Sequence, residues 1–156
     1  MTPQTIAAHA IYLTVREQCL AGNLTRSAST RILTHALSQR AGFMKVVGIT
    51  KEAVEAYEAS GFVYSKGIQR AHLNDRMHTI TDMIERPEPM TAAAMAEYYD
   101  ERDHTVLALS GQNSKINSLE FIPIDDPTVF VSTSVGFRFA KKREGALLRE
   151  LVSEHC

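Results

Sequence analysis

The stretch FMKVVGITKEAVEAYEASG, residues 43–61, lies where the pattern of the sequence changes from helices to a mixture of strands and helices. Its first part, FMKVVGI, is a short apolar run, which is typical of a strand. Thr50 follows directly, and Val54 and Tyr57 then give a helix its inner face before Gly61 ends it. The stretch therefore predicts a strand, a tight turn and a helix.

Before this stretch the pattern is helical. Thr2 can cap a helix that has proline at its first position, and Thr25 can cap a second helix. Apolar residues recur at helical spacing in both segments. The positions expected to be buried are Ala8, Ile11, Val15 and Cys19 in the first helix, and Ile32, Leu33, Ala36 and Leu37 in the second.

After this stretch strands predominate, although helices continue. Leu73, Met77, Ile80 and Ile84 form a helical stripe, and Thr91 caps a further helix. Apolar runs predict strands at residues 68–72, 105–109, 119–124, 128–134 and 136–140, and a last helix begins near residue 144. This order indicates an α+β fold with a helical N-terminal half, a mostly antiparallel, β-rich C-terminal half and a closing C-terminal helix. With no linker in sight, residues 1–156 are expected to form a single domain.

Net charge, cysteine content and the length of apolar runs limit the compartments and partners expected for this chain. The chain has 156 residues, a formal net charge of −1 and two cysteines. Two cysteines cannot build a disulfide framework, and no apolar run approaches the roughly 20 residues of a membrane span, so we expect a cytoplasmic protein without a membrane partner. The near-neutral charge disfavours general binding of polyanions, but a local basic strip can still bind nucleic acid.

The stretch KGIQRAHLNDRMHTITDM, residues 66–83, is the densest polar region. On a strand over 68–72, Arg70 and His72 point to the same face, at the end that leads into a helix. His72 can then act as a general base or metal ligand while Arg70 holds a phosphate. The alternative is a structural histidine that is hydrogen-bonded to the backbone.

The helix that follows adds three polar candidates. Asn74, Asp75 and His78 lie near its start, away from the apolar stripe. Either they extend the site of His72, or His78 is a solvated histidine beside carboxylates, which is the favoured interpretation.

A second constellation is DERDHTVLALSGQN, residues 100–113. Asp103 and His104 stand where a helix passes into a strand, and Asn113 follows a Ser-Gly turn. This arrangement resembles the start of an HNH-type nuclease motif, which implies a metal at Asp103 and His104 and an asparagine that orients the loop. The following SKINSLEFIPI departs from that family, since it is expected to form loop and strand instead of a ligand-bearing helix. The competing interpretation is that Asp103 and His104 are only the end of a helix that leads into a buried strand.

A third feature is GFRFAKKR, residues 136–143. Its cations lie just before or at the start of the last helix, where positive charge interacts unfavourably with the helix dipole. They are Arg138, Lys141, Lys142 and Arg143. They form either a solvated edge or a strip that binds the phosphates of DNA or RNA.

No glycine loop for nucleotides, HExxH zinc site or GxSxG elbow is present. Three functions remain open. The first is a nuclease-like hydrolase that uses His72, Arg70 and His104 with a divalent metal as its cofactor. The others are a non-enzymatic nucleic-acid binder and an accessory protein that binds a protein partner through its helical half. A role linked to nucleic acid is the preferred expectation, and whether the chain is an enzyme stays open.

Overall fold

The computed structural model describes residues 1–40, 44–62, 67–126, 130 and 142–155. These residues form two compact units, each assembled from separate segments of the chain. Residues 1–40 and 74–103 form a helical unit, and residues 44–62, 67–73, 104–126, 130 and 142–155 form a sheet unit. The single domain expected over residues 1–156 stays a prediction.

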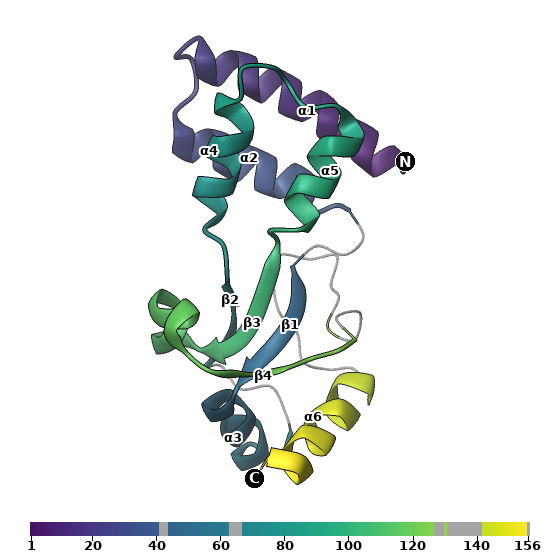
Figure 1. The fold of residues 1–156 in the computed structure, drawn as a ribbon, viewed down its shortest axis with the longest axis vertical. Coiled ribbons are helices and arrows are strands. Elements are labelled where there is room, and N and C mark those ends of the chain that lie inside the picture. The colour runs from purple at the N-terminus through teal and green to yellow at the C-terminus, as the bar shows by residue number, and fades with distance from the viewer. Residues whose placement is uncertain (41–43, 63–66, 127–129, 131–141, 156) are drawn as a thin grey trace. The chain divides into compact units, whose positions relative to one another are not determined.

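The helical unit contains α1 (Pro3–Leu20), α2 (Arg26–Leu37), α4 (Arg76–Glu85) and α5 (Ala92–Asp100). Each begins with a side-chain cap, in which Thr2, Thr25, Asp75 or Thr91 accepts a hydrogen bond from a backbone N–H in the first turn. Helix α1 packs against α2, α4 and α5, and α2 packs against α4 (Figure 1).

Tyr12 fastens α1 to the end of α4. Its side chain is fully buried, and its hydroxyl donates a hydrogen bond to the carbonyl oxygen of Met83 over 3.0 Å. The oxygen of this hydroxyl accepts a hydrogen bond from the backbone N–H of Met90 over 3.2 Å. One hydroxyl therefore satisfies two backbone groups, one near the end of α4 and one in the segment that joins α4 to α5.

The sheet unit is built on four strands in the order β2 (Ile68–His72), β3 (His104–Leu109), β1 (Lys45–Thr50) and β4 (Phe121–Pro123). Strands β1 and β3 are parallel, whereas β2 pairs with β3 and β4 pairs with β1 in the antiparallel sense. Helix α3 (Lys51–Ala59) follows β1 directly, with Thr50 as its cap. A 3-10 helix, η1 (Ser110–Ser118), follows β3, and α6 (Lys142–His155) closes the unit.

The two faces of this sheet carry different cores. On one face α3 and α6 lie side by side (Figure 1), and they bury an apolar cluster that includes Val46, Ile68, Leu107 and Leu148. On the other face a smaller cluster, made of Ala71, Val106, Ala108 and Ile116, packs beneath η1. The buried apolar residues of the strands therefore divide between two distinct cores.

The α+β prediction is confirmed, including the helices before β1, the antiparallel pairs and the closing helix. Three residues expected to be buried are exposed instead: Ile11, Ile32 and Met77. The buried faces include Thr5, Ser29 and Thr79, which a purely apolar pattern leaves out. The rest of the predicted stripes is buried or half-buried, so the hydroxyl residues add to the predicted buried faces at positions that an apolar pattern does not mark.

The loop expected after β3 is also wrong in part, because residues up to Ser118 form η1 before the short strand β4. The Gln112 side chain accepts hydrogen bonds from the Leu109 N–H and the Thr50 hydroxyl, both over 3.0 Å, and so secures the start of η1. The predicted strands over 128–134 and 136–140 lie outside the described residues, apart from Phe130. Across the described part of the chain, the helices are too short or too polar to cross a membrane.

Candidate functional site

Arg70 and His72 lie on one face of β2, as the period of the strand predicts. In the register, Arg70 is opposite Leu107 and His72 is opposite Thr105, so both share the face of Ile68. The Arg70 Nη2 donates a hydrogen bond to the carbonyl oxygen of Phe130 over 2.8 Å, and its Nη1 lies 3.5 Å from the Met44 sulfur. At least one N–H of this guanidinium is therefore used in a structural hydrogen bond to the backbone.

His104 lies on the opposite face of the same sheet. Because Thr105 is paired with His72, the side chain of the preceding His104 points the other way. Burial, and to a smaller degree the charge of Lys45, lowers the pKa of the His104 imidazole. The register thus does not bring His72 and His104 together, and a catalytic pair of these histidines has no support from it.

Asp103 and Asn113, which complete the HNH-like constellation, belong to different units. Asp103 is buried in the helical unit, where its N–H donates to the carbonyl oxygen of Tyr99 over 2.9 Å, whereas Asn113 is exposed on η1 in the sheet unit. Among the residues that the structure describes, no group of three or more histidine, cysteine, aspartate or glutamate side chains could hold a metal ion. The metal site at Asp103 and His104 stays a prediction.

Asn74, Asp75 and His78 organise the start of α4. The Asp75 carboxylate accepts a hydrogen bond from the His78 N–H over 3.0 Å, and the Asn74 amide donates to the carbonyl oxygen of Arg102 over 3.2 Å. The His78 ring is 80% exposed and lies 3.6 Å from the Asp82 carboxylate. This is the geometry of the favoured interpretation, a solvated histidine beside a carboxylate.

The basic strip is only partly described. Arg138 and Lys141 lie outside the described residues. Lys142 and Arg143 occupy the first two positions of α6, and their side chains are likewise outside the described part. Binding of nucleic acid by this strip stays a prediction.

The structure instead gathers polar side chains between α2 and α4. A depression of about 410 Å³ is lined by Thr30, Arg31, Thr34, His35 and Arg76. Two guanidinium groups, an imidazole and two hydroxyls thus border one hollow. None of the described residues that line it has a carboxylate. Guanidinium groups are frequent side-chain donors to phosphate oxygens. The Thr30 hydroxyl donates its own hydrogen bond to the carbonyl oxygen of Arg26 over 2.9 Å, so the guanidinium groups are the main candidate donors of this hollow.

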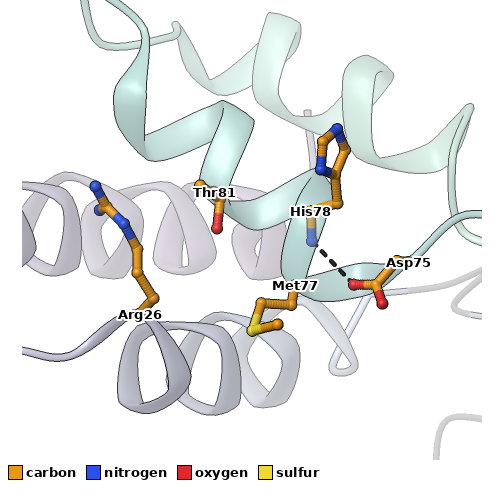
Figure 2. A pocket seen from close by; sticks show the side chains of 5 residues that line it. All are labelled: Arg26, Asp75, Met77, His78 and Thr81. Atoms are coloured by element: carbon orange, nitrogen blue, oxygen red, sulfur yellow. Dashed lines mark hydrogen bonds between the residues drawn. The ribbon is translucent and has the colours of Figure 1, made fainter.

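A second depression of about 580 Å³ adjoins α4 and is lined by Arg26, Asp75, Met77, His78 and Thr81. Figure 2 shows Met77 reaching into the space between α4 and the start of α2, with Arg26 and Asp75 on opposite sides. We call the lining residues of both depressions together the α2–α4 surface.

The carboxylates near this surface already have partners. The Arg26 Nη2 forms an ion pair with the Glu85 carboxylate at 2.6 Å, and Asp75 caps α4. Helix α2, with the sequence RSASTRILTHAL, contains two arginines and no acidic residue. Arg31 therefore stands on a helix whose own charges are only positive, in a chain with a net charge of −1.

The residues of α2 are not among the predicted site residues, because the helical spacing of its apolar residues predicts only its buried side. The signal that could have found them is the run of serine, threonine, arginine and histidine without acid over 26–35. Proximity to Arg76 results from the packing of α2 against α4, which the sequence does not show.

Comparison with protein-family models, with curated proteins and with solved structures finds no match for this chain. The resemblance of residues 100–113 to the HNH-type motif therefore has no support from a family model.

Proposed function

We propose that this chain binds nucleic acid without cleaving it, through phosphate contacts on the α2–α4 surface. The observation that carries the proposal is the hollow that Arg31, His35 and Arg76 line together, with no carboxylate among its described lining residues. Phosphate contacts of this kind position a nucleic acid without reading its sequence. The proposed activity belongs in the cytoplasm, as the composition suggests.

Arg31 is the residue best placed to act as the main phosphate anchor. It is exposed, and it projects from a helix without acidic residues. Arg76 borders the same hollow, and its charge also acts on the Tyr99 hydroxyl, so it is shared with the interior of the helical unit. We therefore place the test on Arg31.

Replacing Arg31 by glutamate should weaken binding of a short labelled oligonucleotide about tenfold, since a hydrogen bond to a charged group contributes roughly 1.5 kcal/mol. The dependence of log affinity on log salt concentration should also become shallower by about one unit. Fluorescence anisotropy across a salt series measures both quantities.

Lys115→Glu is the matched control, because Lys115 is an exposed cation on η1 and the change in charge is the same. It should bind nearly as well as the parent chain. Equal affinities of the parent and Arg31→Glu would refute the role of this surface.

The nuclease-like alternative depends on His72, Arg70 and His104 acting at one place, and no described geometry favours it. Protein binding is the other candidate, and a specific observation favours it. Ile6, Leu13 and Leu20 are exposed at intervals of seven residues along α1. This alternative requires a stable complex with a protein partner when no nucleic acid is present, which size-exclusion chromatography with light scattering would detect.

A further inference from the structure

Met77 is an exposed apolar residue at the α2–α4 surface. Its side chain is 52% exposed, although methionine is usually buried. It lies in the second depression together with Thr81 and Arg26 (Figure 2). A solvent-exposed apolar side chain in this depression, with Arg26 and Asp75 on opposite sides of it, offers a contact surface for a flat, partly apolar group.

The two depressions border the same two helices, and consecutive residues at the start of α4 contribute to both. Arg76 lines the first depression, and its neighbours Asp75 and Met77 line the second. A ligand that crosses the start of α4 would meet Arg31 and Arg76 in the first depression, and Met77 with Arg26 and the capping residue Asp75 in the second. Nucleotides have this combination, with an anionic phosphate next to a flat base.

We propose that the α2–α4 surface recognises single-stranded nucleic acid, with a phosphate at Arg31 and an unpaired base against Met77. This inference rests on the proposed function and goes further by naming the form of the ligand. The second depression, of about 580 Å³, lies within the roughly 300–1,000 Å³ of sites that hold small organic groups.

The choice of single strands follows from which part of a base is accessible. In a duplex the faces of the bases are stacked on one another, and only their edges are exposed in the grooves. In a single strand the face is open and can lie against a side chain. Methionine sulfur makes favourable contacts with aromatic rings, so Met77 suits a base face.

The test compares three labelled probes of equal length by anisotropy: a single strand, the duplex of the same sequence, and a single strand without bases. The parent chain should bind the single strand roughly twofold to tenfold more tightly than the abasic strand, as expected for one thioether–ring contact. It should also bind the single strand more tightly than the duplex.

Met77→Ala should abolish the preference over the abasic strand and leave the affinity for the abasic strand unchanged. Ile32→Ala is the matched control, because it also shortens an exposed apolar residue of the helical unit, and it should keep the preference. A parent chain that binds the single strand and the abasic strand equally, or a preference that survives Met77→Ala, would overturn this inference and leave the proposed function standing. Failure of all three probes to bind would overturn both.

Discussion

The variant Asp100→Ala should lower the free energy of unfolding by about 2–4 kcal/mol, because it leaves the buried guanidinium of Arg40 without its counter-charge. The Arg40 side chain is only 7% exposed, and its Nη2 lies 2.6 Å from the Asp100 carboxylate. Asp100 itself is 37% exposed, so we place the effect below the upper limit known for fully buried pairs.

A smaller effect acts in the opposite direction. Asp100 is the last residue of α5, where a negative charge interacts unfavourably with the helix dipole by about 0.3–1 kcal/mol. Removing the Asp100 charge therefore raises the free energy of unfolding slightly through the helix dipole. Losing the partner of Arg40 costs more than this gain, so destabilisation should dominate.

Urea unfolding followed by circular dichroism measures this difference. Glu101→Ala is the matched control, since Glu101 adjoins Asp100 and its ion pair with Arg102, at 3.3 Å, is exposed. Such surface pairs contribute about 0–1 kcal/mol, so the control should unfold nearly like the parent chain. An Asp100→Ala variant as stable as Glu101→Ala would show that Arg40 does not depend on this pair.

The second large effect concerns Tyr12. The change Tyr12→Phe keeps the ring and removes the hydroxyl that serves the Met83 carbonyl and the Met90 N–H. The hydrogen bond to the Met83 carbonyl is buried, and a buried group left without a partner costs about 1–3 kcal/mol. The Met90 N–H is only partly buried and adds less, so we expect a total loss of roughly 2–3 kcal/mol. Unfolding in urea should therefore begin at a clearly lower concentration.

Tyr99→Phe is an internal control for this prediction. Tyr99 is also buried, but within the described residues its hydroxyl makes no hydrogen bond. Removing it should change stability by less than about 0.5 kcal/mol or increase it slightly. The role given to the Tyr12 hydroxyl would be wrong if the two phenylalanine variants were equally stable.

Tyr99 also allows a check against pH. Burial, and to a smaller degree the nearby Asp103 carboxylate, raises the pKa of its hydroxyl in the folded chain. Above the ordinary tyrosine pKa of about 10 the unfolded chain releases this proton and the folded chain keeps it, so stability falls as pH rises. Tyr99→Phe should remove this part of the alkaline destabilisation.

Local chemistry explains which parts of the fold could be predicted. The caps Thr2, Thr25, Thr50 and Thr91 act through hydrogen bonds to residues three positions on, so a short window of sequence contains the whole interaction. The same is true of the apolar runs that became β1 and β3. The packing of helices through Ser29 is different, because it depends on a neighbour from another part of the chain.

The candidate site was harder to predict for a related reason. The shared face of Arg70 and His72 follows from the strand period, and it was predicted. The position of His104 depends on the pairing of His72 with Thr105, which joins residues more than thirty positions apart. Likewise, Arg31 and Arg76 meet only because α2 packs against α4. Such long-range registers are not visible in the sequence.

Amide chemical shifts provide the most direct test of nucleic-acid binding by the α2–α4 surface. Addition of a single-stranded oligonucleotide to the isotope-labelled full chain should shift the amides of α2 and of the first turn of α4 most strongly. The amides of β2 and β3 should change little. Shifts concentrated around Arg70, His72 and His104, with α2 unchanged, would contradict this assignment and restore the sheet unit as the place to look.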